Sequence, residues 1–527
     1  MTVLRRHPDV HGAGLSIAEW RAIIDSAYSG ARQGAICNVD ESRGGHFDAI
    51  FVGGGSAGRF GAAVLRSLGG RALVLERWPF LGGSCPHQAC VPHHLFSEAA
   101  RELDQWQALQ GRLWFPPFDP AAASILELVQ LFRAQRSGPH AHMNWQSADQ
   151  LGIEFVVNTE AEVLDTRTVR AAGRAYTAEA LVLATGSRAA RPGIEGEGLP
   201  GVFDYASLVE DLDYEPRRIV VIGGSKVAVE YGSFFRAVGR PTVIVSRSAL
   251  LTSGGPARMD ADLRQFVVDG MRTRGIDVLE HSVATRIVGD GRVQGVEVLT
   301  PSGTQFLEAD FVLLGTGEEA VTESFADALP LRYDPRGFVA VDDRMRTNLD
   351  GVYAAGDVIG PPMEMFKSRR SGTTAARTIM GLDAEFHYQD IPDFLHTTYE
   401  VTWAGLTEDE SRARFGDVAT IQLPPHGMSP GDTPLPMAEG SMLYGFTLPE
   451  RTGFQKCVID PGSRKVVGIH HAGYGAKTAF QYLHHLMRRP EGLTIDELGD
   501  MNELYISSDY FVGYARLRAN QATLTSM

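Results

Sequence analysis

An apolar run that leads straight into a glycine-rich turn predicts a strand, a tight turn and a helix early in the chain. Phe47–Val52 is followed by Gly53-Gly54-Gly55-Ser56-Ala57-Gly58, which fits the pattern G-x-G-x-x-G. Glycines at these positions allow the turn and let the amino end of the helix approach a pyrophosphate closely. A second apolar run, Ala72–Glu76, ends in an acid that can accept hydrogen bonds from a ribose. The segment therefore predicts a dinucleotide-binding unit.

A second, degenerate copy of this unit begins at Ile219–Ile222. Its turn is Gly223-Gly224-Ser225-Lys226-Val227-Ala228, with Glu230 on the helix that follows. The next strand, Thr242–Val245, is followed by Ser246 and Arg247 instead of an acid. An arginine at this place suits the 2′-phosphate of NADPH; the alternative is an arginine that is only solvated at a strand end.

Two further apolar runs each close on a small glycine motif, and these runs predict the domain order. Leu181–Leu183 leads into Thr185 and Gly186, and Phe311–Leu314 leads into Gly317. A later strand ends at Asp357, and from about residue 391 strands and helices alternate in a new pattern. We expect an α/β protein with two Rossmann-like dinucleotide-binding domains and a C-terminal α+β dimerisation domain. The expected segments are an N-terminal extension (1–46), a first nucleotide domain (47–193 and 321–390), a second (194–320) and a dimerisation domain (391–527).

Composition excludes several classes of protein. A chain of 527 residues is long enough for three or four domains. The formal net charge of −15, without a long basic run, makes nucleic acid an unsuitable partner. No apolar run approaches the roughly 18–20 residues that span a bilayer, and no apolar segment follows the first residues as in a secretory signal. In the extension only an amphipathic segment near 17–28 stands out, and its function is not readable.

The four cysteines include one close pair. Cys85 and Cys90 lie in the run Gly82-Gly83-Ser84-Cys85-Pro86-His87-Gln88-Ala89-Cys90, whereas Cys37 and Cys457 are isolated. A short loop between two cysteines can close a strained and easily reduced disulfide, which predicts redox work. The alternatives are two inert buried thiols or a zinc site, and a structural zinc site normally needs a second ligand pair. A chain with so few cysteines is typical of a reducing compartment, and we therefore expect a cytoplasmic protein.

Taken in order, these motifs resemble those of the pyridine nucleotide-disulfide oxidoreductases from residue 47 onward. The resemblance implies a homodimer, an FAD domain interrupted by an NADPH domain, and a Cys85–Cys90 disulfide that the flavin reduces. Cys90 would lie beside the flavin as the charge-transfer thiolate, and Cys85 would attack the substrate sulfur. The residues expected to bind the two cofactors are Gly53, Gly55, Ser56, Gly58, Glu76, Arg77, Gly83, Ser84, Thr185, Gly186, Gly223, Ser225, Lys226, Glu230, Arg247, Gly317, Asp357 and Met365.

Within the family the chain is most similar to the 2-ketopropyl-coenzyme M oxidoreductase/carboxylase branch. The similarity rests on the runs 77–94, 362–367 and 471–477. It implies that Arg59 and Arg369 hold the coenzyme M sulfonate, with Met365 and Gly513 in the substrate site. His87, Cys85 and Cys90 would be catalytic. At the C-terminus the chain departs from that branch, with Tyr505, Tyr510 and Gly513 in place of Phe, His and Gln.

This resemblance leads to a specific reaction. We expect reductive cleavage of a coenzyme M-type β-keto thioether, with the enolate either captured by carbon dioxide or protonated. Tyr505 and Tyr510 would decide between the two outcomes, because a phenol can give a proton to an enolate; the alternative is that both only pack. Two other functions stay open: a general NADPH-dependent disulfide or quinone reductase, and a non-catalytic flavoprotein used for binding.

Overall fold

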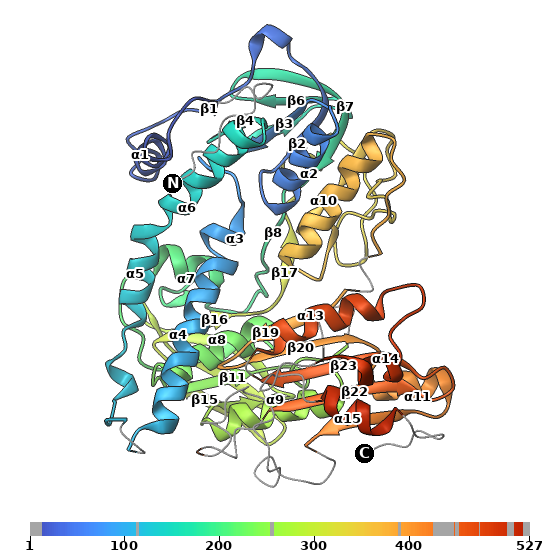
Figure 1. Cartoon of the computed structure of the whole chain (residues 1–527). Helices are drawn as coiled ribbons and strands as arrows, with labels where there is room; N and C mark the ends of the chain where they lie inside the picture. The colour runs from blue at the N-terminus through green and yellow to red at the C-terminus, as the bar shows by residue number, and fades with distance from the viewer. Residues whose placement is uncertain are drawn as a thin grey trace.

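The computed structural model describes residues 13–111, 115–252, 258–387, 391–424, 447, 453–473, 475–502 and 511–519. The two strands around the first glycine-rich turn form as predicted, as β2 (His46–Val52) and β3 (Ala72–Glu76). They pair in parallel; β3 is buried throughout and β2 is buried except at His46 and Asp48, because apolar side chains from both faces enter one core. Figure 1 shows their sheet at one end of the molecule.

The first sheet has the order β1-β4-β3-β2-β7-β6-β5, with β18 added beside β7. Its other strands are β1 (Ile36–Cys37), β4 (Glu154–Val157), β5 (Ala161–Val163), β6 (Thr168–Ala171), β7 (Arg174–Leu183) and β18 (Val352–Ala354). Because β18 follows the whole second sheet in sequence, the first nucleotide unit is interrupted by the second. We retain the boundaries at residues 193, 320 and 390 as a proposal.

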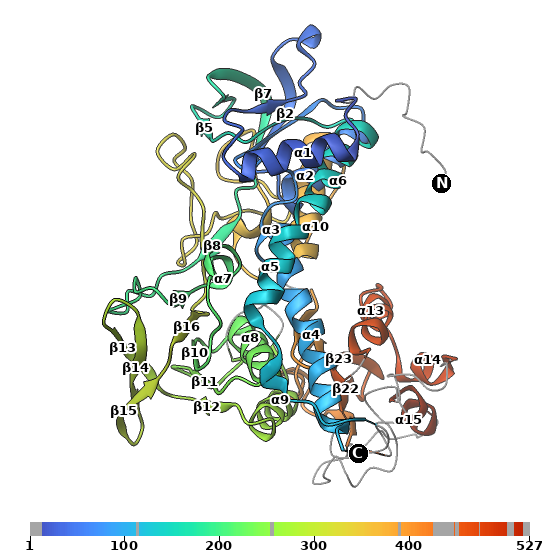
Figure 2. The ribbon, with the colours of Figure 1, turned by 90° about the vertical axis from the view of Figure 1, so that its left-hand side faces the viewer.

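Helices cover this sheet and lead away from it (Figures 1 and 2). They are α1 (Ile17–Tyr28), η1 (Glu41–Arg43), α2 (Ser56–Ser67), α3 (Ser84–His87), α4 (Cys90–Leu109), η2 (Pro120–Ala122), α5 (Ile125–Gln135), α6 (Ser137–Trp145), the π-helical turn η3 (Gln146–Gln150), η4 (Gly356–Ile359) and α10 (Met365–Ile379). Helix α10 lies along α2, so the segment from Met365 onward returns to the first glycine-rich turn.

The second nucleotide unit is a fully parallel sheet with the order β12-β11-β10-β16-β9. Its strands are β9 (Val202–Phe203), β10 (Ile219–Ile222), β11 (Thr242–Val245), β12 (Asp277–Leu279) and β16 (Phe311–Leu314). Helices α7 (Tyr205–Asp211), α8 (Lys226–Ala237) and α9 (Ala261–Thr273) accompany it. An antiparallel sheet forms from β13 (Val283–Gly289), β14 (Val293–Thr300) and β15 (Gly303–Glu308), and β8 (Ser187–Ala189) pairs with β17 (Glu318–Ala320).

The C-terminal part is an antiparallel sheet with helices, which confirms the predicted fold class. The sheet order is β19-β20-β23-β22-β21. Its strands are β19 (Asp393–His396), β20 (Glu400–Gly405), β21 (Ala419–Leu423), β22 (Phe454–Asp460) and β23 (Lys465–Gly473), and its helices are α11 (Glu408–Phe415), α13 (Ala476–Met487), α14 (Ile495–Asp500) and α15 (Phe511–Arg518). No helix among the described residues is long and apolar enough to cross a membrane.

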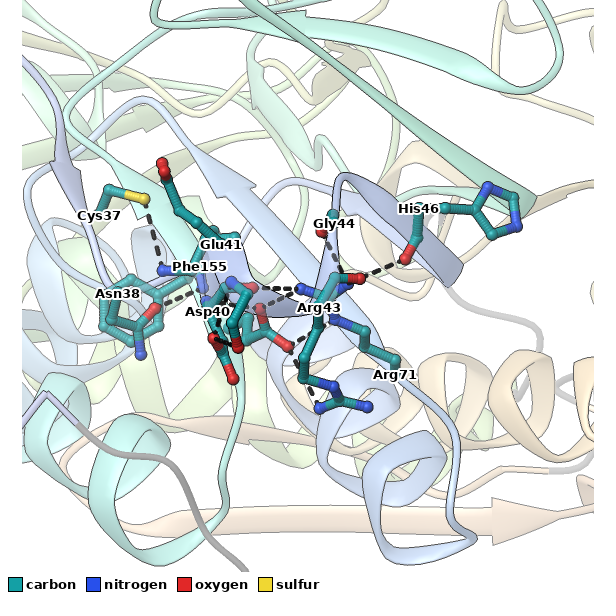
Figure 3. A network of polar contacts seen from close by, with 12 residues as sticks. Cys37, Asn38, Asp40, Glu41, Arg43, Gly44, His46, Arg71 and Phe155 are labelled. Carbon is teal, nitrogen blue, oxygen red and sulfur yellow. Dashed lines mark hydrogen bonds and ion pairs between the residues drawn. The ribbon is translucent and has the colours of Figure 1, made fainter.

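The N-terminal extension is fixed onto the first sheet. Strand β1 pairs with β4, and Trp20 and Ile24 of α1 are buried in the core of this sheet. Figure 3 shows the polar network that holds the connecting loop: the guanidinium of Arg71 donates to the carbonyl oxygens of residues 40, 43, 44 and 46. The same guanidinium makes two 2.8 Å hydrogen bonds to the buried carboxylate of Glu154.

We predict that Arg71→Met destabilises the protein by about 3–5 kcal/mol, because the buried Glu154 carboxylate loses both guanidinium hydrogen bonds. It then keeps only the amide of Asp40 and the half-exposed guanidinium of Arg43, 3.7 Å away. The matched control is Arg170→Met, which breaks an exposed ion pair with Glu162 and should cost about 1 kcal/mol or less. Urea unfolding of the holoprotein compares the two. Equal losses for both variants would contradict the prediction.

Candidate redox site

The cysteine motif lies directly against the first glycine-rich turn. Gly82 forms a bridge with Gly55, and a Cβ atom on Gly83 would lie 2.6 Å from the Cα atom of Gly55. Gly83 also has a φ of +69°, so a side chain here would be both strained and in collision. The close approach of these two backbones places the start of α3, at Ser84, beside the amino end of α2.

The two thiols of the motif are close together and differ in pKa. Cys85 lies in α3, Cys90 is the first residue of α4, and both are free thiols that share a hydrogen bond. The hydrogen bond from Cys90 lowers the pKa of Cys85, and the positive charge of Arg369 acts in the same direction. The same hydrogen bond and burial raise the pKa of Cys90. In this dithiol, Cys85 is therefore the thiol that ionises more readily and is the better nucleophile.

Met365 and Arg369 lie near Cys85, and Arg59 lies near Arg369. The sulfur of Met365 lies 3.7 Å from that of Cys85. The guanidinium groups of Arg59 and Arg369 lie 5.7 Å and 4.5 Å from the centre of the Phe60 ring. Burial, and then the charge of Arg369, lowers the pKa of Arg59. Two cations therefore lie close together, and their role toward a sulfonate stays a prediction.

Neither arginine has a carboxylate partner among the residues that the structure describes. Arg59 donates instead to neutral oxygens, to Ser147 at 2.8 Å and to Gln146 at 2.5 Å. The Nε atom of Arg369 is buried without a hydrogen-bond acceptor in the same set of residues. Two adjacent guanidinium groups with uncompensated charge can hold an oxyanion.

His87 lies in a cluster of rings that the sequence did not reveal. The rings of Trp78, Phe80, Tyr28 and His140 lie 4.7, 5.0, 5.9 and 5.6 Å from it, centre to centre. Burial lowers the pKa of His87 to about 3, so the ring is neutral at pH 7. Tyr28 and His140 come from α1 and α6, far from the motif in sequence, and nothing local marked them as part of the site.

The first turn has the shape that FAD requires. A Cβ on Gly53 would lie 2.3 Å from the carbonyl oxygen of Ala184, and Gly55, the N-cap of α2, offers no side chain to its amide groups. These amides are suited to a pyrophosphate. The buried carboxylate of Glu76 accepts a 2.7 Å hydrogen bond from the amide of Gly54 and lies at the end of β3. The residues present therefore fit a flavin dinucleotide.

Other predicted cofactor residues gather at the same edge of the first sheet. Thr185 follows β7 and donates to the carbonyl oxygen of Val321 at 2.5 Å. Asp357 lies in η4, where it accepts a 3.0 Å hydrogen bond from Ser368. Arg77 follows β3, with its guanidinium 4.9 Å from the ring centre of Trp78. Gly58 and Gly186 complete this group, and their roles toward FAD stay predictions.

The second glycine-rich turn, after β10, is held to the rest of the molecule by ion pairs. Ser225 is the N-cap of α8, and the ammonium of Lys226 is bound to the carboxylates of Glu364 and Asp393. Glu230 accepts a 2.7 Å hydrogen bond from the amide of His396, and burial raises its pKa to about 8. Gly223 follows β10 directly, and Gly317 lies in the turn between β16 and β17.

Arg247 follows β11 and is exposed, without a hydrogen-bond or ion-pair partner among the described residues. Tyr505 and Tyr510 lie outside those residues. Gly513 lies in α15, and its expected role toward the substrate stays a prediction. In the described ranges no group of three His, Cys, Asp or Glu side chains could hold a metal ion.

The comparison with known families decides the classification. The family described as pyridine nucleotide-disulphide oxidoreductase matches residues 47–377. The chain belongs to this family. The dimerisation domain of the same family matches residues 391–502. The family is FAD-dependent and uses a pyridine nucleotide, so this member is an enzyme of the flavin disulfide oxidoreductase class.

Relatives cover most of the chain at low identity. Mercuric reductase of Staphylococcus aureus is 25% identical over 484 residues, which cover 89% of this chain and 82% of the relative. Soluble pyridine nucleotide transhydrogenase of Aliivibrio fischeri is 28% identical over 389 residues, or 71% and 79% of the two chains. The solved structure of the HOCl-induced flavoprotein disulfide reductase RclA from Escherichia coli has the same fold, with a TM-score of 0.72 at 20% identity over 89% of this chain and 99% of that one.

Proposed function

We propose that the protein is an FAD- and NADPH-dependent homodimeric dithiol oxidoreductase that cleaves a coenzyme M-type β-keto thioether. The observation that carries the proposal is the pair Arg59 and Arg369. Their guanidinium groups have no carboxylate partner in the described residues, and the charge of Arg369 acts on Cys85. A sulfonate has the charge and the oxygen geometry that such a pair binds. The close cysteine pair in a chain with only four cysteines supports a reducing, cytoplasmic location.

The proposed reaction of the dithiol balances in atoms and electrons. When bound, FAD supplies the electron pair, taken from NADPH, that opens the Cys85–Cys90 disulfide. The Cys85 thiolate attacks the thioether sulfur, an S–S bond forms, and the C–S bond breaks to release the ketone fragment as an enolate. The Cys90 thiolate attacks the mixed disulfide, so that the coenzyme M thiolate leaves and the Cys85–Cys90 disulfide forms again. One NADPH is oxidised for each thioether cleaved.

The enolate has two possible fates, carboxylation or protonation. Incubation with NADPH, the ketone thioether and labelled bicarbonate distinguishes them, because label in a β-keto acid requires capture of carbon dioxide. A ketone without label requires protonation. NADPH oxidation that depends on neither the thioether nor its sulfonate would overturn the proposal. In that event turnover of small disulfides or quinones supports the general reductase, and turnover of mercuric ion supports the activity named for the S. aureus relative.

We predict that Arg247→Ala shifts the nucleotide preference. Arg247 is exposed where β11 ends, a suitable place for a guanidinium that binds the 2′-phosphate of NADPH. The KM for NADPH should rise about 10- to 150-fold, as expected for the loss of one charged hydrogen bond, while the KM for NADH should change less than about threefold. Arg217→Ala, at the amino end of β10, removes the same charge at the other end of the sheet and should alter neither value. Equal changes for both nucleotides would contradict the prediction.

A further inference from the structure

The N-terminal extension lies next to the reaction site, because its helix α1 packs against α6 (Figure 2). Arg21 of α1 donates to the hydroxyl of Ser137 at the start of α6. The last residue of α1, Tyr28, is the one that enters the ring cluster around His87. Its ring is nearly parallel to that of His87, with a 4° angle between the planes.

The ring of His140 is held between the hydroxyl group of Tyr28 and the carbonyl group of Pro86. Its oxygen lies 2.7 Å from Nδ1 of His140, and Nε2 of the same ring lies 3.3 Å from the carbonyl oxygen of Pro86. A carbonyl oxygen only accepts, so Nε2 of His140 carries the hydrogen. Because burial lowers the pKa of His140 to about 3, the ring is neutral and Nδ1 accepts from Tyr28. Pro86 lies between Cys85 and His87, so this chain of hydrogen bonds ends inside the cysteine motif.

The charged groups around His87 complete the arrangement. Nε2 of His87 lies 3.5 Å from a carboxylate oxygen of Glu210, which the guanidinium of Arg136 also binds. The same guanidinium lies 4.9 Å from the ring centre of Tyr28. Nδ1 of His87 is buried without a hydrogen-bond partner among the described residues. The groups that face His87 are therefore Tyr28 from α1, Arg77 after β3, Arg136 between α5 and α6, His140 from α6 and Glu210 from α7.

We propose that Tyr28 is a positioning residue of the reaction site: its ring covers His87 and its hydroxyl orients His140 against the cysteine motif. The extension before the first nucleotide unit is then part of the site. Without the ring, water reaches His87, and the nearby Glu210 carboxylate favours its protonated form. Without the hydroxyl alone, His87 stays covered and only His140 loses its partner. The two parts of the side chain can therefore be tested separately.

Emission from Trp78 reports the protonation of His87, because a protonated imidazole quenches a neighbouring indole and the two rings are 4.7 Å apart. The measured signal is the indole emission of the holoprotein minus that of the same holoprotein with Trp78→Phe. Both are titrated from pH 8 to pH 4. It should stay constant down to about pH 5 with native Tyr28 and in Tyr28→Phe. In Tyr28→Leu it should fall as the pH falls, with a midpoint between about 5 and 6.5, near the usual histidine pKa. A constant signal in Tyr28→Leu would overturn the covering role.

The hydroxyl is tested by separating the two half-reactions. Tyr28→Phe should slow reoxidation of the NADPH-reduced protein by the thioether about 2- to 10-fold, the effect of one lost hydrogen bond, and leave bleaching of the flavin by NADPH unchanged. Tyr176→Phe, which removes a hydroxyl from β7 of the same sheet, should change neither rate. Unchanged reoxidation in Tyr28→Phe would overturn the orienting role. The inference rests on the proposed function only for the identity of the substrate. A small aromatic disulfide is therefore used as a second oxidant in parallel with the thioether. The Trp78 titration needs no substrate.

Discussion

Replacing Cys85 with serine should lower steady-state turnover of the thioether on the order of 10³-fold or more, while NADPH still bleaches the flavin. A serine hydroxyl does not ionise near neutral pH, so the nucleophile that attacks sulfur is lost. The electron transfer from NADPH to the flavin does not need it. Stopped-flow absorbance with NADPH alone, followed by steady-state turnover, separates these two effects. Bleaching that is lost together with turnover would mean that the variant is damaged beyond the thiol.

Replacing Cys90 should have a different result, because its expected role is to release the product. Cys90→Ser keeps the thiol with the lower pKa, so one substrate molecule should still be cleaved per subunit. The coenzyme M fragment then stays on Cys85 as a mixed disulfide, and an added small thiol should remove it. Intact-protein mass spectrometry measures the adduct. Cys37→Ser, a change at an exposed cysteine in β1, should turn over normally. Several turnovers without adduct in Cys90→Ser would contradict the assigned roles.

The sequence predicts the elements around each glycine-rich turn to within a residue. Ala72–Glu76 and Thr242–Val245 have the bounds that the local pattern indicates, and the amphipathic segment near 17–28 forms the helix Ile17–Tyr28. A buried parallel strand appears in the sequence as a short apolar run, and the tight turn that ends it needs glycine because other side chains would collide there. These signals lie within the few residues that form the element, so one chain is enough to read them.

The side chains that surround the dithiol could not be predicted from local sequence patterns. Tyr28, His140 and Glu210 meet at His87 from three helices that are far apart in the sequence. None of them lies in a motif, and a tyrosine at the end of an amphipathic helix is usually a packing residue. Their convergence follows from the packing of α1, α6 and α7, which depends on long-range contacts. The resemblance did place Arg59 and Arg369 together, but it did not give Gln146 and Ser147, the partners of Arg59.

Replacing Arg369 with glutamine tests the sulfonate directly. Its guanidinium has a buried Nε atom without an acceptor in the described residues, so removing the charge breaks no ion pair there. The KM for the sulfonate thioether should rise about 10- to 150-fold, from about 1.5–3 kcal/mol for a charge-assisted hydrogen bond. An analogue with a methyl group in place of the sulfonate should show less than about a threefold change, because it has no charge for the arginine to bind.

Arg370→Gln is the matched control, since Arg370 is the next residue of α10 and its guanidinium lies over Phe386, away from the Phe60 ring that Arg369 contacts. It should leave both KM values unchanged. Arg369→Lys should recover only part of the affinity, because an ammonium keeps the charge but lacks the planar fork that matches two sulfonate oxygens. If Arg369→Gln affects the charged and uncharged substrates equally, the arginine pair serves the fold or the flavin. The case for a coenzyme M-type substrate then falls, while the dithiol chemistry of Cys85 and Cys90 stands.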